Sequence, residues 1–171
     1  MPERSRGDRH DRIDRTDARL LERLQVDGRR PYADLGADVG ISGPSAHERV
    51  KKLEARGVIR GYAASVDPAA AGYGITAFSW LTQAPGTPGT DLTDAFAGIP
   101  EVEECHHIAG EADYLLKIRA RDTHHLETVI VRLQGIPSVF TSETDIVLST
   151  AFERRPLRLA DADETDGPGP A

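Results

Sequence analysis

A turn centred on a single glycine most constrains how this chain can fold. Residues 33–62 read as two short helices joined by Val39-Gly40-Ile41 and followed by an extended segment. Gly40 can take the left-handed backbone conformation that ends one helix, and the Ser42 hydroxyl can then cap the next helix. Two helices joined in this way predict a helix-turn-helix, whose second helix is the one offered to a DNA groove.

Charge is divided unevenly along the chain, and this division limits which part can meet DNA. The 171 residues carry a net charge of -7. Residues 1–62 contain 14 Lys or Arg against 11 Asp or Glu, whereas the remaining residues contain 7 against 17. Phosphates would repel the acidic part, so only the N-terminal part is expected to face a duplex.

Several classes of protein are disfavoured by composition. No apolar run approaches the roughly 18 residues of a membrane span, and the charged N-terminus lacks the apolar stretch of a secretory signal, so we expect a cytoplasmic protein without a membrane partner. Cys105 is the only cysteine and is expected to be a buried small hydrophobe. Neighbouring histidines on a strand point to opposite faces, so neither a metal site nor a cofactor is expected at His106-His107.

The N-terminal part is expected to contain three helices and a wing. A first helix is capped by Thr16 or Asp17 and stops at Gly28, the second covers 33–39 and the third 43–56. In the third helix an apolar stripe repeats at helical spacing and predicts the buried face. The stripe consists of Ala46, Val50 and Leu53. Residues 58–63 have strand character, so a short hairpin or wing is expected there.

The C-terminal part predicts an α+β fold in which helices cover one side of a sheet. Its elements follow the order β-α-β-β-α-β of the ferredoxin-like plan. We place them at 75–82, 91–97, 102–109, 114–120, 123–134 and 139–148. One sheet face is left uncovered by two helices on the other face, and pairing with a second copy would bury it. A homodimer is therefore expected.

The two ends of the chain, 1–13 and 160–171, are expected to be disordered.

Four stretches of the chain together resemble the Lrp/AsnC, or feast/famine, transcription regulators. They are IDRTD from Ile13, GISGPSAHERVKKLEARGVIRGYAASVDP from Gly40, VEECHHIAGEADYLLKIRARD from Val102 and GIPSVFTSETDIVLST from Gly135. The resemblance implies a winged helix-turn-helix at 14–63, a linker at 64–73, a RAM-type sensing and oligomerisation domain at 74–152 and a C-terminal extension at 153–171. It also implies dimers that often assemble into octamers, and an amino acid or related metabolite bound between dimers as effector.

The exposed side of the third helix supplies the candidates for contact with double-stranded DNA. Ser45 and His47 lie in its first turns, where base edges are usually read, whereas Arg49, Lys51 and Lys52 suit phosphates or guanine edges. With the cap residue, the set is Ser42, Ser45, His47, Arg49, Lys51 and Lys52. An ordinary solvated helix face remains the alternative interpretation of these residues.

A loop between two strands is the candidate effector site. Gly110 permits a tight turn whose backbone amides could receive a ligand carboxylate, and Asp113 could receive an ammonium group. An ordinary hairpin turn explains the same residues. The resemblance favours the effector interpretation and adds hydroxyls from the last strand. His107, which shares a strand face with Cys105, is expected near the same cavity. The set is Gly110, Glu111, Asp113, His107, Ser142 and Thr144.

These patterns predict a sequence-specific regulator of transcription that responds to an amino acid. No catalytic constellation is evident, so an enzyme is not expected. One rival is a relative of the sirohaem decarboxylases, which share the two-domain plan and in which His106 or His107 would act on a tetrapyrrole. The other rival is a nucleoid-type architectural protein with little sequence preference.

Overall fold

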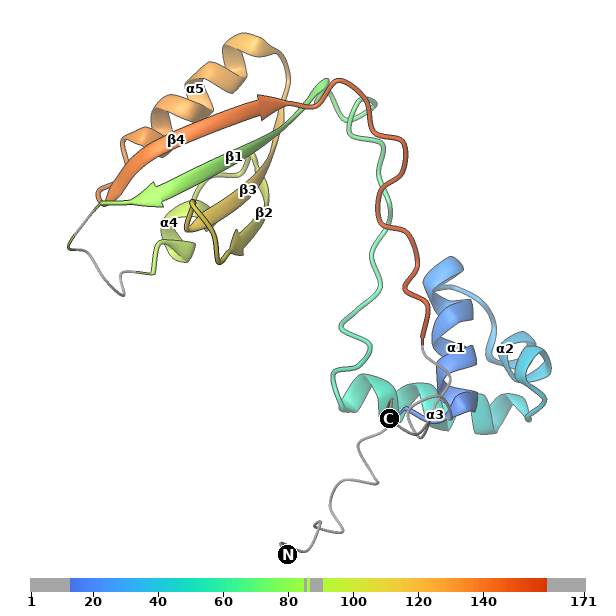
Figure 1. Ribbon diagram of the computed structural model, residues 1–171. Coiled ribbons are helices and arrows are strands. Elements are labelled where there is room, and N and C mark those ends of the chain that lie inside the picture. Colours follow the sequence, from blue (N-terminus) through green and yellow to red (C-terminus); the bar gives the residue numbers. More distant parts are fainter. Residues whose placement is uncertain (1–12, 85, 87–90, 160–171) are drawn as a thin grey trace, which may run out of the picture. The chain divides into compact units, whose positions relative to one another are not determined.

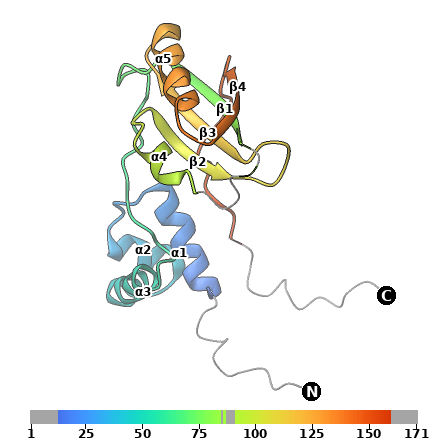
Figure 2. The ribbon, with the colours of Figure 1, turned by 90° about the vertical axis from the view of Figure 1, so that its left-hand side faces the viewer.

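The computed structural model describes residues 13–84, 86 and 91–159, and these form two compact units. The first unit combines residues 13–64 with 152–159, and the second contains residues 65–151. Figures 1 and 2 show the helical first unit and the sheet of the second. The N-terminal and C-terminal tails expected to be disordered lie outside the described residues, apart from Ile13. None of the described helices is long and apolar enough to cross a membrane.

Three helices form the first unit. They are α1 (Arg15–Val26), α2 (Tyr32–Val39) and α3 (Gly43–Ala55). The cap of α1 differs from the sequence expectation of Thr16 or Asp17, because the Asp14 carboxylate accepts the Asp17 N–H at 2.8 Å. With Asp14 as the cap, the Asp17 side chain is turned inward and becomes part of the helix packing, where it is 9% exposed.

The turn between α2 and α3 is tight because two glycines allow it. Gly40 ends α2 with a φ of 77°, as predicted, and leaves room for the chain to reverse. Gly36 faces the turn itself, where a Cβ atom would lie only 2.6 Å from the Ile41 carbonyl oxygen. Ser42 caps α3 as predicted, since its hydroxyl accepts the Ser45 N–H at 3.3 Å. The unit core contains fully buried Leu20, Leu35 and Ala46.

No strand forms at residues 58–63, where the sequence favoured a strand or wing. The Val58 and Ile59 N–H groups instead donate to the Leu53 carbonyl at 2.9 and 3.2 Å, which closes the end of α3. Tyr62 then folds back, and its hydroxyl donates to Glu54 at 2.9 Å. A strand needs a neighbour to complete its hydrogen-bond ladder, and no described segment of the chain supplies one here.

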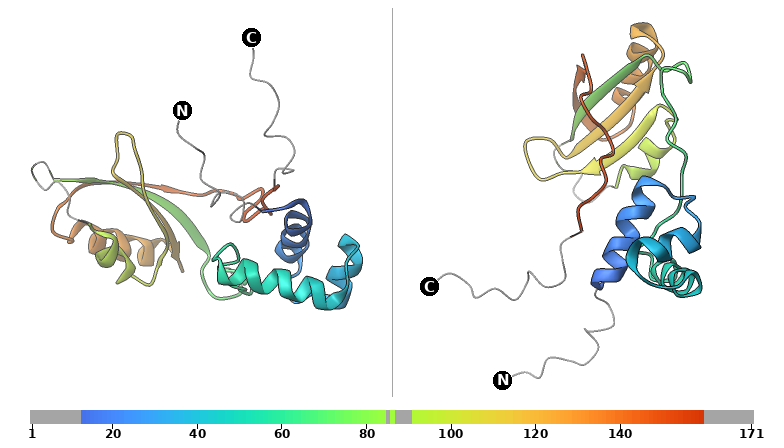
Figure 3. Two further views of the ribbon diagram at one scale, coloured as in Figure 1. Left: turned by 90° about the horizontal axis from the view of Figure 1, so that it is seen from below. Right: turned by 90° about the vertical axis from the view of Figure 1, so that its right-hand side faces the viewer.

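The second unit is a four-stranded antiparallel sheet with two helices. Its elements are β1 (Ile75–Gln83), α4 (Thr93–Ala97), β2 (Val102–His107), β3 (Tyr114–Ala120), α5 (Thr123–Gln134) and β4 (Val139–Ile146). The strand order is β2-β3-β1-β4, which confirms the predicted ferredoxin-like plan. Figure 3 shows α4 and α5 on the same face of the curved sheet. Asp122 caps α5 as predicted.

The core of the second unit lies between this sheet face and the two helices. Alternate residues of β3 point into it, and Leu116 and Ile118 are fully buried there. Phe96 of α4 packs edge-on against Tyr114, with ring centroids 5.2 Å apart. Val129 and Leu133 of α5 complete the layer and are also fully buried. None of the helices that the structure describes covers the opposite sheet face (Figure 3), so its side chains are available for other roles.

Candidate nucleic-acid and effector sites

The outer face of α3 is a polar surface held in place by the buried stripe beneath it. Ala46, Val50 and Leu53 are all at most 1% exposed, so the helix cannot roll without exposing them. Side chains on the other side line a shallow cleft of about 780 Å³. These lining residues include Pro44, Ser45, Glu48, Arg49, Lys52 and Arg56. The surface is elongated along the helix, which suits a groove of DNA.

Two of the predicted DNA contacts are engaged at the start of α3. The Ser42 hydroxyl lies 2.8 Å from the Ser45 hydroxyl and also caps the helix, so Ser42 shapes this end of the helix. His47 is half-buried, and its ring lies 4.5 Å from the ring of Tyr32 in α2. Ser45 is exposed, and its hydroxyl shares this hydrogen bond with Ser42.

Arg49 is part of the structure of the unit. Its guanidinium forms ion pairs with Asp14 at 2.6 Å and with Asp17 at 2.8 Å, which ties α3 to the first turn of α1. Burial raises the pKa of the Asp14 carboxyl, but hydrogen bonds from the Asp17 N–H and from Arg49 outweigh it and hold the pKa below the usual 3.8. A phosphate would have to compete with two carboxylates for this arginine.

Lys51 and Lys52 are the two cations of α3 that point outward. Both are exposed, and among the described residues neither forms an ion pair. Because a lysine carries its ammonium group on a long, flexible side chain, both residues suit contacts to phosphates. Of the three predicted cations of α3, the structure thus leaves these two for an external anion and commits Arg49 internally.

The loop that follows β2 borders a cleft of about 630 Å³ on the open face of the sheet. Gly110 and Glu111 line this cleft, as do Ile108 and Ala112 from the same loop. The wall from β1 and β4 was not part of the sequence prediction. It consists of Trp80, Thr82, Thr141, Glu143 and Asp145. The structure therefore brings together two of the six predicted effector residues.

The other four predicted effector residues lie elsewhere. Asp113 accepts the Gln83 N–H at 2.7 Å and so fixes the end of β1. His107 stacks on Tyr114 with centroids 5.0 Å apart. Ser142 accepts a hydrogen bond from the Gln134 side chain at 3.0 Å, and Thr144 shares one with Ser79 at 2.8 Å.

Strand alternation explains the placement of Ser142 and Thr144. Successive residues of a strand point to opposite faces, so the two hydroxyls that contact α5 and β1 on the helix side cannot also face the cleft. Glu143, opposite Trp80 in the register, takes the cleft side. The even spacing of Trp80 and Thr82 along β1 was the sequence signal that could have identified this wall.

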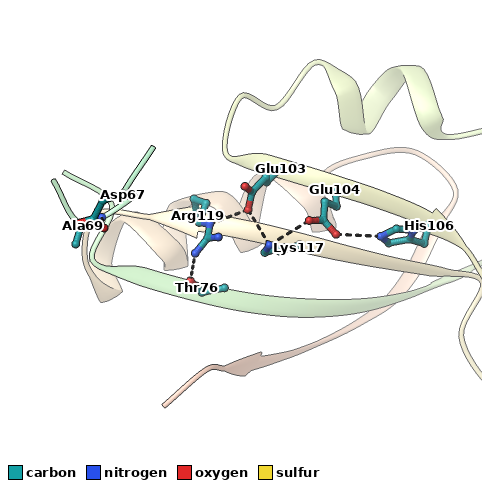
Figure 4. Close-up of polar contacts among 8 residues, drawn as sticks. All are labelled: Asp67, Ala69, Thr76, Glu103, Glu104, His106, Lys117 and Arg119. Atoms are coloured by element: carbon teal, nitrogen blue, oxygen red, sulfur yellow. Dashed lines mark hydrogen bonds and ion pairs between the residues drawn. The ribbon is translucent and has the colours of Figure 1, made fainter. Parts of the chain in front are cut away.

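A network of charges crosses the open sheet face between β2 and β3. The Lys117 side chain is only 4% exposed, and its ammonium lies 3.2 Å from Glu103 and 3.1 Å from Glu104. Arg119 extends the network, because it pairs with Glu103 at 2.7 Å and hydrogen-bonds the Thr76 hydroxyl. Figure 4 shows the continuous row of contacts, which ends at His106 beside Glu104.

A strand irregularity makes this network possible. The register of β2 against β3 shifts between Val102 and Glu104, so two successive carboxylates can both reach Lys117. Burial raises the pKa of Glu103, but hydrogen bonds from Arg119 and Lys117 outweigh it and lower the pKa below its usual value. The acidic groups therefore stay ionised opposite the buried lysine.

Metal-binding chemistry has no assembled site in the described part of the chain. No group of three or more His, Cys, Asp or Glu side chains there could hold an ion. His125 contacts Glu101 at 3.1 Å, whereas His106 contacts Glu104 at 3.3 Å. One histidine from each adjacent pair therefore contacts a different carboxylate. Cys105 is half-buried against the core, and burial raises the pKa of its thiol.

Both units match models of one family. Residues 13–54 match the AsnC-type helix-turn-helix domain, and residues 76–157 match the Lrp/AsnC ligand binding domain. Among curated relatives, the HTH-type transcriptional regulator LrpA of Mycobacterium tuberculosis is 34% identical over 143 residues, which cover 84% of this chain and 95% of the relative.

Two solved structures of similar proteins contain L-methionine. A feast or famine regulatory protein of M. tuberculosis complexed with L-methionine has a TM-score of 0.80 at 32% identity and covers 84% of this chain and 97% of that chain. A transcriptional regulator of Neisseria meningitidis, also in an L-methionine complex, has a TM-score of 0.80 at 28% identity and covers 85% and 96%.

The contact of Arg49 with Asp14 predicts a pH-dependent stability. Because the folded-state pKa of Asp14 is below 3.8, its ion pair stabilises the fold above that pH and the gain is lost as the pH falls through the folded value. Asp14→Asn keeps a capping side chain but removes the charge. At neutral pH we expect a loss below about 1 kcal/mol, since the pair is largely exposed. The free energies of unfolding in urea should converge as the pH falls through the lowered pKa of Asp14, and a pH-independent difference would contradict the ion pair.

Proposed function

The chain belongs to the Lrp/AsnC family of regulators, and on that premise we propose that it is a sequence-specific transcriptional regulator whose DNA binding responds to an amino acid or a related metabolite. One observation carries this proposal: the same chain contains a helix, α3, with exposed lysines on its outer side and a sheet unit that matches the family's ligand-binding domain. A regulator of this kind acts on the chromosome, so the proposed compartment is the cytoplasm.

The proposed DNA surface is the exposed side of α3. Ser45 and His47 are proposed to face base edges, whereas Lys51 and Lys52 face phosphates on either side of the groove. One helix makes few base contacts, and each contributes about 1–3 kcal/mol of discrimination. Two copies on half-sites about one helical turn apart would double that number, so pseudo-palindromic operators are proposed.

The second copy is proposed to pack on the open face of the sheet. Phe78 and Trp80 form an aromatic pair there, with centroids 6.5 Å apart, and Leu115 lies beside Trp80 in the register. The adjoining lysine is already almost closed off from solvent by its two carboxylates. An apolar patch with a neutralised charge network is suited to burial against a copy of itself. Further assembly of dimers, as far as octamers, is proposed on the family resemblance.

The effector is proposed to bind between dimers at the loop that carries Gly110 and Glu111. The two relatives crystallised with L-methionine make an amino acid the first candidate. An effector that binds one assembly better than another would shift the population toward it and so change which operators are occupied. The rival interpretations as an enzyme or an architectural protein gain no support, since the similar proteins are named regulators and His106 is engaged by Glu104.

Removal of the two outward lysines should weaken DNA binding without regard to sequence. For Lys51→Ala combined with Lys52→Ala, we expect the slope of log affinity against log salt to fall by about 1 for each phosphate that the variant no longer neutralises. Fluorescence anisotropy at several salt concentrations measures both effects. Arg121→Ala is the matched control, because it removes an exposed cation from the sheet unit. Unchanged affinity and slope in the double variant would remove these lysines from the DNA surface.

A charge on the open sheet face should separate the two copies. We expect Phe78→Glu to give a monomer at micromolar concentration. The new carboxylate would be buried opposite Lys117, whose charge Glu103 and Glu104 already neutralise. Size-exclusion chromatography with light scattering measures the mass. Val131→Glu adds the same charge to an already exposed position of α5 and should leave the dimer intact. A monomeric parent protein, or a dimeric Phe78→Glu, would contradict this interface.

An amino-acid effector should stabilise the protein against heat. A ligand at 100 times its dissociation constant adds about 2.7 kcal/mol to the state that binds it. A thermal-shift screen of the twenty amino acids, with L-methionine first, should find at least one such ligand. Gly110→Val should abolish the shift without lowering the melting temperature, because nothing lies within 4 Å of a Cβ atom there. A flat screen would favour a regulator without an amino-acid effector.

A further inference from the structure

Residues 152–159, which come after β4 in the chain, belong to the first unit, called the DNA-binding unit below; the second unit is called the sheet unit. Residues 152–159 cluster with residues 13–64 and not with the sheet that precedes them in the chain. The Gln25 side-chain amide holds Leu157 from both sides: its Nε2 donates to the Leu157 carbonyl at 3.1 Å, and its Oε1 accepts the Leu157 N–H at 2.7 Å. One glutamine thus satisfies both backbone groups of a residue, as a neighbouring strand would.

An apolar cleft of α1 and of the stretch after α3 lies beside this contact. Leu157 and Leu159 line it, with a volume of about 460 Å³. The facing residues include Leu21, Leu24, Val58 and Ile59. One wall of this cleft is thus formed by residues 157–159 and the opposite wall by α1 and the stretch after α3. Leu157 remains 72% exposed, so the contact is shallow and depends mainly on its backbone hydrogen bonds.

The docked segment changes how the DNA-binding unit is attached. Residues 65–74 lead from that unit into β1, and residues 147–151 lead from β4 back toward it. A body held by one flexible linker rotates freely about its attachment point, whereas a second attachment point narrows the range of orientations that it can take. The second attachment continues from β4, which supplies Thr141, Glu143 and Asp145 to the cleft beside the effector loop.

We propose that residues 152–159 are a strap that docks on α1 and makes the DNA-binding unit follow the sheet unit. The coupling role of the strap rests on the proposed function, because it matters only if the spacing of two DNA-binding units is regulated. With the strap docked, the orientation of each DNA-binding unit is restricted, and so is the half-site spacing that a dimer accepts. When the strap is released, residues 65–74 alone connect each DNA-binding unit to its sheet unit.

Two substitutions release the strap and one leaves it in place. Leu157→Pro removes the N–H that donates to Gln25, and Gln25→Ala removes the partner. Leu157→Ala keeps both backbone groups and trims a mostly exposed side chain, so it is the matched control. Comparison of the three variants separates the effect of releasing the strap from the effect of losing the Leu157 side chain.

Double electron–electron resonance spectroscopy, which measures the distribution of distances between two spin labels, tests the restraint directly. The labels are placed at Ala37→Cys in α2 and Glu127→Cys in α5, in a Cys105→Ala background of the full-length protein diluted with unlabelled protein. We expect one narrow distance distribution in the parent and in Leu157→Ala, and a broad one in Leu157→Pro and Gln25→Ala. Equally narrow distributions in all four, or an equally broad parent, would overturn the proposal.

Operator spacing supplies the functional readout. The probes are duplexes selected by the parent protein from random DNA, with the half-site spacing then changed by about 5 bp, half a helical turn. We expect the change in spacing to lower the DNA affinity of the parent protein by about tenfold or more. The affinity of the strap-free variants should fall by less than about threefold. Equal binding of an isolated half-site would show that the strap-free unit is folded. Equal spacing penalties would overturn the coupling, whereas a parent without DNA binding would refute the proposed function and leave the distance test valid.

Discussion

One-sided burial governs both units of this protein. In the sheet unit, two helices cover one face, and the period of two along each strand sends every other side chain to the face that they leave open. In the DNA-binding unit, α3 has a single buried stripe, so its polar side must point outward. The surface proposed for DNA and the surface proposed for a second copy are therefore direct consequences of where the cores lie.

Local signals in the sequence were sufficient for most of the fold. The turn at Gly40 and the caps at Ser42 and Asp122 depend on neighbouring residues, and so does the order of helices and strands along the chain. The structure confirms them. The strand expected at 58–63 failed because a ladder requires a distant partner. The wall of the cleft on β1 and β4 was missed for a related reason, since strand register determines which hydroxyls meet the loop and which meet α5.

Long-range pairing also decides which charges remain for a partner. Arg49 looks like its neighbours in sequence, yet carboxylates 32 and 35 residues earlier engage it and leave Lys51 and Lys52 as the outward cations of α3. On the sheet, Lys117 is paired so completely that its charge is neutralised within the unit. The same residue type is thus left exposed, and proposed to contact phosphates, in one unit, whereas in the other it holds two strands together.

The contact between Gln25 and Leu157 also bears on the order in which the protein is made. These residues are 132 positions apart in the sequence. A ribosome that adds about 5–20 residues per second needs roughly 7 to 26 seconds to span that distance. During this interval the three helices of the nascent chain exist without their last segment. On the proposed role of residues 152–159, the three helices are therefore synthesised well before the segment that is proposed to restrain them.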